Sequence, residues 1–237
     1  MKQYSCILMD ADRTLFDFDT AQEEALKATL ELPLSAQGKS FDPEVLKLYR
    51  EISNHLWGMY EKCEITQAQL QRSRFQILLE KLGIPVGEES ADAYNRKFVE
   101  QLGEGAYLID GAETLCRRLF ENGYPLFIVT NGIESSQKKR LEKSAIQPYI
   151  QEMFISEAVG FPKPRKEFFD FVFAKIGEAH RPHSIILGDS LSTDIAGGIQ
   201  AGIDTCWYNS GGLNNPNLPC TYEIRKLLDF FTLDGIL

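Results

Sequence analysis

Short runs of apolar residues alternate with longer amphipathic segments along most of this chain. The first run, residues 6–9, is too short for a helix and does not alternate between polar and apolar positions. Such a run is typical of a strand buried on both faces of a parallel sheet. Similar runs follow at residues 125–129, 153–155, 184–187 and 204–208. Because segments with helical spacing separate the runs, the pattern predicts an α/β fold, a doubly wound, Rossmann-like parallel sheet with right-handed crossovers.

Residues 17–105 follow a different, helical pattern. Apolar residues there recur every three or four positions, as at Val45, Leu48, Ile52, Leu56 and Tyr60. Thr66 and Gln69 have the spacing of a capping box, which marks the start of a helix. We therefore predict an inserted α-helical bundle over residues 17–105, directly behind the first strand. Residues 1–16 and 106–237 are left to form the α/β core.

Helical spacing also places elements between the core strands. Helices are predicted to end near residue 122, to span about 134–145 and 166–176, to run toward 201–202, and to form the tail at 222–231. The stretch Asp110-Gly-Ala-Glu113 looks like the cap of the first of these helices. Each pair of strands would then be joined by a helix, as parallel crossovers require.

Polar residues stand at the ends of three predicted strands. Asp10 and Asp12 follow the first strand, Thr130 and Asn131 a second, and Asp189 a third. Each cluster taken singly fits a solvated turn, because Asp and Asn are common in turns. In an open α/β sheet, however, ligands bind in the crevice at the carboxyl ends of the strands. Convergence of all three clusters on that edge favours a functional site.

The pair Asp10 and Asp12 is the strongest chemical signal in the chain. Two carboxylates two residues apart project to the same side of an extended chain. Such neighbours repel one another at neutral pH, so they need a cation, a shared proton or both. Lys163, in a loop between strands, and Asp194, behind Asp189, would lie at the same crevice if the topology holds.

Composition narrows the class of protein. The chain has 237 residues, 43% of them hydrophobic and 25% charged, as expected for an ordinary globular protein. Its net charge of −9 argues against a nucleic-acid surface. The five scattered cysteines lack a C-x-x-C motif and fit reduced thiols, and no apolar run reaches membrane-spanning length. We expect a cytoplasmic monomer or small homo-oligomer without nucleic-acid or membrane partners.

The polar clusters resemble, in order, the four motifs of the haloacid dehalogenase (HAD) superfamily. The matching segments are Asp10-Ala-Asp12-Arg-Thr14, Thr130-Asn-Gly132, Lys163-Pro164 and Gly188-Asp189-Ser-Leu-Ser-Thr-Asp194. The resemblance spans residues 4–208, and the helical insertion looks like the cap of the subfamily whose cap follows strand one. Residues 156–164 and 188–209 further resemble noncanonical pyrimidine 5′-nucleotidases.

This resemblance implies a phosphomonoester hydrolase that forms an aspartyl-phosphate intermediate. Asp10 would attack phosphorus, while Asp12 would protonate the leaving alkoxide and later take a proton from water. Lys163 would stabilise charge in the transition state. The phosphate would also be bound by the Thr130 hydroxyl and by the backbone N–H groups of Asn131 and Gly132.

The resemblance also implies a Mg²⁺ cofactor, with Mn²⁺ as a substitute. Asp10, Asp189 and the backbone carbonyl of Asp12 would hold the ion, because Mg²⁺ prefers oxygen ligands. Thr14, Ser190 and Asp194 would support these residues, Asp194 by orienting a metal-bound water or by holding Lys163. The cap would close over the leaving group and select the substrate.

The closer resemblance implies a small phosphorylated metabolite as substrate, a pyrimidine (deoxy)nucleoside monophosphate. Phosphoglycolate and sugar-phosphate phosphatases share the same motifs and stay as alternatives, and a mutase remains open. A dehalogenase is disfavoured because carbon–halogen cleavage does not need a second acid such as Asp12. A non-enzymatic phospho-accepting signalling module lacks the inserted cap. Arg13, a bulky cation where relatives vary, is expected to reach toward the cap or a substrate carboxylate.

Overall fold

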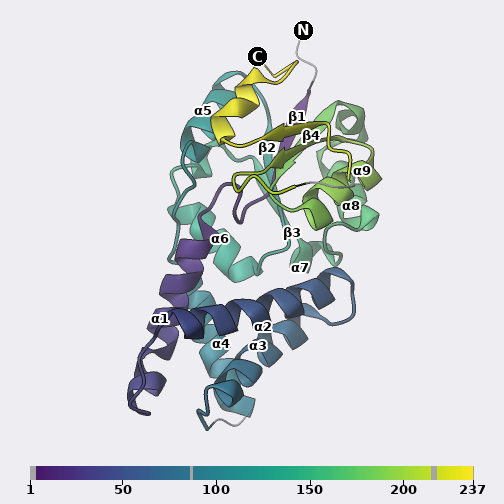
Figure 1. The fold of residues 1–237 in the computed structure, drawn as a ribbon. Helices are drawn as coiled ribbons and strands as arrows, with labels where there is room; N and C mark the ends of the chain where they lie inside the picture. Colours follow the sequence, from purple (N-terminus) through teal and green to yellow (C-terminus); the bar gives the residue numbers. More distant parts are fainter. Residues whose placement is uncertain (1–3, 86–87, 215–217, 237) are drawn as a thin grey trace. The chain divides into compact units, whose positions relative to one another are not determined.

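The computed structural model describes residues 4–85, 88–214 and 218–236. The chain divides into two compact units, which we call the core unit and the helical unit (Figure 1). The core unit consists of Met1–Phe18 and Ala106–Leu237, and the helical unit of Asp19–Gly105. The helical unit is therefore an insertion that leaves the core shortly after its first strand and returns to it before its second.

The core unit is built on a six-stranded sheet with the order β3-β2-β1-β4-β5-β6. The strands are β1 Cys6–Met9, β2 Leu126–Thr130, β3 Glu152–Ile155, β4 Ser184–Gly188, β5 Asp204–Tyr208 and β6 Tyr222–Ile224. Every neighbouring pair runs parallel. The predicted doubly wound parallel sheet is confirmed.

Helices cover both faces of this sheet (Figure 1). Successive strand residues point to opposite faces, so Ile7 and Met9 join the core that includes α5 (Ala112–Glu121). Cys6 and Leu8 join the core that includes α8 (Lys166–Ile176). Both faces of β1 are buried, which explains its unbroken apolar run.

The tail of the chain differs from its predicted helix. Residues 222–224 form β6, which pairs with β5 from Cys206↔Tyr222 to Tyr208↔Ile224. A 3₁₀ helix, Leu227–Thr232, follows and buries Leu227 and Phe230. The prediction was wrong because Tyr222–Ile224 pair with β5 instead of continuing the helical pattern, and β6 becomes the short edge strand of the sheet.

The start of α5 lies within the stretch predicted to cap it, Asp110-Gly-Ala-Glu113. The N-cap residue is Gly111, at φ 85°, and no side chain caps the helix there. Glycine tolerates this left-handed backbone without steric cost. Leu228 from the tail helix lies 3.2 Å from where a Cβ of Gly111 would stand, so the tail packs closely against this turn.

The helical unit is a bundle of α1 (Phe18–Ser35), α2 (Pro43–Glu61), α3 (Gln67–Lys81) and α4 (Glu88–Leu102). Asp42 caps α2 by accepting from the Val45 N–H at 2.9 Å. Both hydrogen bonds of the predicted capping box between Thr66 and Gln69 are present at the start of α3. That prediction is confirmed.

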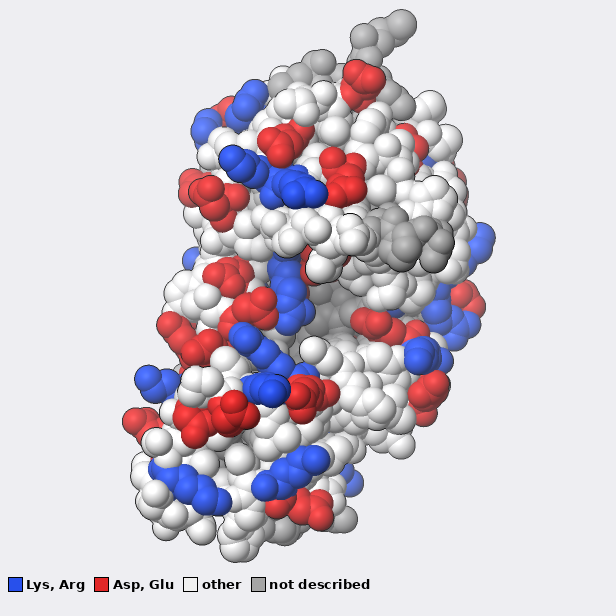
Figure 2. All heavy atoms as spheres, viewed as in Figure 1, with Lys and Arg blue, Asp and Glu red and all other residues white. Residues whose placement is uncertain are grey.

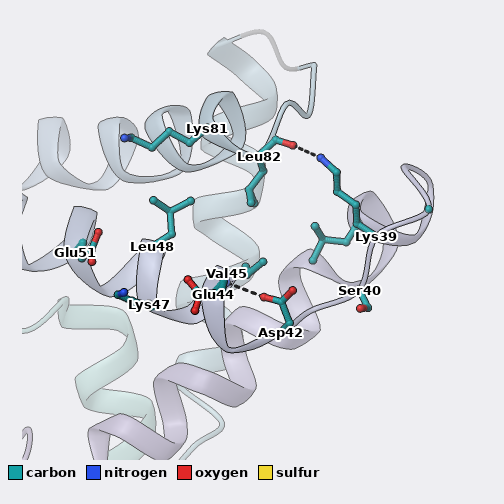
Figure 3. Close-up of a pocket in the computed structure, with 12 residues that line it drawn as sticks. Lys39, Ser40, Asp42, Glu44, Val45, Lys47, Leu48, Glu51, Lys81 and Leu82 are labelled. Atoms are coloured by element: carbon teal, nitrogen blue, oxygen red, sulfur yellow. Dashed lines mark hydrogen bonds between the residues drawn. The ribbon is translucent and has the colours of Figure 1, made fainter.

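A surface pocket of about 670 Å³ lies in the helical unit, at the loop after α1, the first half of α2 and the end of α3 (Figure 3). Lys39 reaches across it, and its Nζ donates to the Leu82 carbonyl at 2.6 Å, where a cation complements the end of α3. The lining mixes lysines and carboxylates and contains none of the sequence-predicted site residues.

Charged side chains of both signs lie on the face of the molecule drawn in Figure 2. Figure 2 shows basic and acidic side chains interspersed over each unit. Within the described part of the chain, no helix has both the length and the apolar character needed to cross a membrane.

Candidate active site

The candidate site lies where the strand order reverses. From β1 the chain builds outward through β2 and β3, and then returns to the other side of β1 with β4. Open α/β sheets bind ligands at such a switch point. Asp10 and Asp12 follow β1, and Asp189 follows β4. The Asp10 N–H donates to the Leu187 carbonyl at 2.8 Å, which fixes Asp10 at the end of the ladder between these strands.

Lys163 is the centre of the site. Its side chain is 2% exposed, and its Nζ donates to Asp10 Oδ1 at 2.6 Å, Asp194 Oδ1 at 2.6 Å and the Val129 carbonyl at 2.7 Å. An ammonium has three N–H donors, so all three are used. Burial alone would lower the pKa of Lys163, but Asp10 and Asp194 outweigh burial and raise it. Lys163 is therefore a permanent buried cation.

Asn131 holds the loop that carries Lys163. Its side-chain Nδ2 donates to the Lys163 carbonyl at 2.9 Å, and its Oδ1 accepts from the Lys163 N–H at 2.8 Å. An amide side chain can bind both the N–H and the C=O of one residue because it offers both a donor and an acceptor. This side-chain role of Asn131 differs from the backbone role predicted for it, since nothing local in the sequence links residue 131 to residue 163.

Three carboxylates gather beside the ammonium. Oxygen atoms of Asp10, Asp189 and Asp194 all lie within 4.8 Å of one another. Burial raises the pKa of Asp10 well above its ordinary value, and Asp194 and Asp189 add to the effect, while Lys163 opposes it. Burial, followed by Asp194, raises the pKa of Asp189 to about 7. Ionised, the three carboxylates and one ammonium leave a formal charge of −2, which a divalent cation would neutralise. Carboxylate oxygens suit a hard ion such as Mg²⁺.

Asp194 supports the site through both of its oxygens. Oδ1 accepts from Lys163, and Oδ2 accepts from the Ser190 N–H at 3.1 Å. A Cβ on Gly188 would stand 2.3 Å from the Asp194 carboxyl, so residue 188 must lack a side chain for Asp194 to take this position. Asp194 is thus placed to hold Lys163.

Asp12 lies apart from that cluster. Two residues of α6 (Glu134–Lys143) bind its carboxylate. Gln137 Nε2 donates to Oδ2 at 2.6 Å, and Arg140 forms an ion pair with Oδ1. Sequence reasoning missed both residues. The available signal was their spacing of three on the helix after Thr130-Asn131-Gly132, which puts them on one helix face.

The remaining predicted residues surround this centre. The buried Thr130 hydroxyl accepts from the Gly132 N–H at 3.0 Å, so that N–H is already engaged within the loop, while the hydroxyl keeps its own proton to donate. The Thr14 hydroxyl is fully buried and has no hydrogen-bond partner among the described residues. Ser190 Oγ accepts from the Thr193 N–H at 3.3 Å, which caps the turn carrying Asp194.

Two residues flank Asp189. Trp207 Nε1 donates to the Asp189 carbonyl at 2.9 Å and ties this loop to β5. The positive charge of Arg13 acts against the rise in the Asp189 pKa. The guanidinium of Arg13 lies 4.9 Å from the centroid of the Phe18 ring, and Arg13 has a left-handed backbone with φ 62°.

Known proteins are similar to this chain in sequence or in fold over most of their length. Residues 7–208 match the haloacid dehalogenase-like hydrolases. The HAD-hydrolase YfnB of Bacillus subtilis is 38% identical, with 100% of this chain and 97% of YfnB covered. Its crystal structure bound to magnesium has a TM-score of 0.87 at 37% identity, covering 98% of each chain. The pyrimidine 5′-nucleotidase YjjG of Escherichia coli is 32% identical, covering 95% of each chain. PynA of Streptococcus pneumoniae, also a pyrimidine 5′-nucleotidase, is 32% identical, covering 95% of this chain and 93% of PynA.

Proposed function

This chain belongs to the haloacid dehalogenase-like hydrolase family, and from that premise we propose that it is a Mg²⁺-dependent phosphomonoester hydrolase acting through an aspartyl-phosphate. The observation that carries the proposal is the contact of Lys163 Nζ with Asp10, beside Asp189, at the sheet switch point. A carboxylate aimed into this crevice supplies a nucleophile, and the buried ammonium offsets the charge of a phosphoryl group.

The position of each site residue is consistent with one step of this reaction. An Asp10 carboxylate oxygen bonds to phosphorus as the bond to the leaving oxygen breaks, and Asp12 gives that oxygen a proton. Water next attacks phosphorus, Asp12 takes its proton, and the bond between Asp10 and phosphorus breaks. The Thr130 hydroxyl donates to a phosphoryl oxygen, and the positive charge of Lys163, held beside Asp10, offsets the charge of the phosphoryl group. Mg²⁺, held by Asp10, Asp189 and the Asp12 carbonyl, would supply further positive charge.

We propose pyrimidine nucleoside monophosphates as the substrates. The support is that two relatives at 32% identity over nearly their whole length are pyrimidine 5′-nucleotidases. A sugar-phosphate phosphatase is the second candidate, because a relative at 27% identity is a glyceraldehyde 3-phosphate phosphatase. The motif residues are shared between these activities, so the helical unit is the part we propose selects the leaving group.

A phosphate-release screen tests this function. The enzyme with Mg²⁺ is offered pyrimidine and purine nucleoside monophosphates, phosphoglycolate and sugar phosphates, and kcat/KM is measured for each. We expect the highest kcat/KM for pyrimidine (deoxy)nucleotides. A higher value for sugar phosphates would move the assignment to the second candidate, and no phosphate release from any of these compounds would refute a phosphatase.

The raised pKa of Asp189 predicts a pH-dependent affinity for Mg²⁺. Because that pKa is about 7, the ion must displace a proton from Asp189 at lower pH. We expect the Mg²⁺ association constant to fall by roughly tenfold per pH unit below pH 7. Calorimetric titrations of the metal-free protein between pH 5.5 and 8.5 would measure it. Asp189→Asn is the control, expected to bind weakly with a smaller pH dependence.

The raised pKa of Asp189 also makes the stability of the metal-free fold depend on pH. Between its ordinary pKa of 3.8 and the folded value of about 7, Asp189 is protonated in the folded metal-free protein but ionised in the unfolded chain. This group therefore stabilises the metal-free fold at the acidic end of that window, and the contribution is lost as the pH rises to 7. Mg²⁺ should restore stability above pH 7. For the affinity titration, an Mg²⁺ association constant that does not change from pH 5.5 to 8.5 would contradict the role of Asp189 as a metal ligand.

A further inference from the structure

Both carboxylate oxygens of Asp12 are held by one helix. Gln137 Nε2 donates to Oδ2 at 2.6 Å, and the Nη1 of Arg140 pairs with Oδ1. These two residues lie three positions apart on α6, so both reach the loop after β1 from the same helix face. A carboxylate bound at both oxygens has its plane and its side-chain torsions set by its partners.

Arg140 is a buried cation whose hydrogen-bonding capacity is only partly used. The residue is fully buried, and its guanidinium lies 4.5 Å from the centroid of the Phe16 ring and 5.9 Å from that of Phe18. Its Nε and Nη2 are buried and have no hydrogen-bond partner among the described residues. The ring faces attract the guanidinium, but burial leaves its unbonded N–H groups desolvated, so packing alone does not account for a cation at this position.

A second observation is that the side chain of Gln137 occupies the space that a side chain at residue 132 would need. A Cβ at residue 132 would stand 2.1 Å from Gln137 Nε2 and 2.8 Å from the carbon atoms behind it. The backbone of Gly132 is not in the left-handed region, so steric room, not backbone conformation, requires glycine here. The amide of Gln137 passes over Gly132 to reach Asp12.

We propose that Gln137 and Arg140 are positioning residues that fix the orientation of the Asp12 carboxylate for proton transfer to the leaving group. The inference rests on the proposed phosphatase function, in which Asp12 exchanges that proton. Each carboxylate oxygen has two lone pairs, so one donor per oxygen leaves a second lone pair for the transferred proton. A carboxylate held this way is already oriented, whereas a rotating one spends part of its time misaligned.

Leaving-group dependence tests the orientation directly. Gln137→Met removes the amide donor and keeps the length of the side chain. We expect kcat/KM for phenyl phosphate, a poor leaving group, to fall about tenfold, and kcat/KM for 2,4-dinitrophenyl phosphate to fall less than about twofold, because a good leaving group departs without a proton. The ratio kcat/KM covers the steps up to leaving-group departure and excludes later hydrolysis of the intermediate.

Two further variants complete the test. Arg140→Lys keeps the charge but loses the planar fork, so we expect the same selectivity for poor leaving groups with a smaller loss than in Arg140→Met. Lys138→Met is the matched control on the same helix, since Lys138 is exposed and pairs with Glu134. It should leave both kcat/KM values unchanged. Thermal unfolding of every variant checks that the protein is folded.

The outcomes separate this inference from the proposed function. If Asp12→Asn discriminates between the two substrates and Gln137→Met does not, the positioning role is wrong and the phosphatase mechanism stands. Equal losses for both substrates in Gln137→Met would likewise overturn the positioning role. If Asp12→Asn itself shows no discrimination, the acid role in the proposed function fails and the inference fails with it.

Discussion

Asp10→Asn is expected to reduce phosphate release by at least about 10⁴-fold, the largest effect of any single substitution in this chain. A neutral amide is a poor nucleophile toward phosphorus, while its size and its carbonyl oxygen are close to those of the carboxylate. The variant should fold, because the oxygen can still accept from Lys163 and because Asp194 and the Val129 carbonyl also hold that ammonium.

Two measurements check this prediction. Steady-state phosphate release gives the loss of turnover, and mass spectrometry of acid-quenched enzyme tests for a phosphoryl group on Asp10. Wild type should show the covalent adduct and Asp10→Asn should not. Asp110→Asn, an exposed carboxylate of the core unit, is the control for the substitution type. A variant that retains more than about a tenth of the wild-type turnover would assign the attack to another group.

Lys163→Met is expected to impair both stability and turnover. Removing the ammonium leaves Asp10 and Asp194 buried without their cation, and breaking one side of a buried ion pair costs about 3–5 kcal/mol in the free energy of unfolding. Turnover should fall by roughly 10²–10³-fold, as when a charge-stabilising donor is removed from an active site. Urea denaturation and phosphate release measure the two effects.

The loss of stability in Lys163→Met should depend on pH because the buried carboxyl group of Asp10 can take up a proton. Without the ammonium that opposes it, burial raises the pKa of Asp10 further, and a neutral carboxyl group costs less to bury than an ion. The loss of stability should therefore be smaller at pH 5 than at pH 8. In wild type, by contrast, the raised pKa of Lys163 keeps its contribution present throughout the neutral range.

Lys166→Met is the matched control on the neighbouring helix. Lys166 is 59% exposed and pairs with Asp170 one turn along α8. Exposed pairs of this kind contribute less than about 1 kcal/mol. Equal destabilisation by Lys163→Met and Lys166→Met would mean that the buried network around Lys163 does not hold the core unit together.

Ion pairs between buried charged side chains hold the candidate site together. Lys163 meets two carboxylates directly, and a third, Asp189, lies within the same small cluster. One ammonium cannot neutralise three ionised carboxylates, which leaves a formal charge of −2 in the cluster. Burial, together with the neighbouring carboxylates, raises the pKa values of Asp10 and Asp189.

Local patterns were enough to predict the framework. Residues 6–9 read as a strand buried on both faces because a central parallel strand has no solvent side. The alternation of strands and helices predicted the doubly wound sheet, and the place of Asp10 and Asp189 after their strands predicted that they would meet at one edge. Lys163 Nζ and Asp10 Oδ1 do meet, at 2.6 Å, although 153 residues separate them. The helical insertion predicted at residues 17–105 corresponds to a compact unit at Asp19–Gly105.

Tertiary structure alone decided which side chains meet around that framework. The amide of Asn131 pairs with the backbone of Lys163, Gln137 and Arg140 grip Asp12, and the tail supplies a strand to the edge of β5. Periodicity along a chain reports which face of an element is buried, because burial follows the repeat of the helix or strand. A hydrogen bond or ion pair between distant residues leaves no such periodic trace, because its partners are brought together by the packing of whole elements.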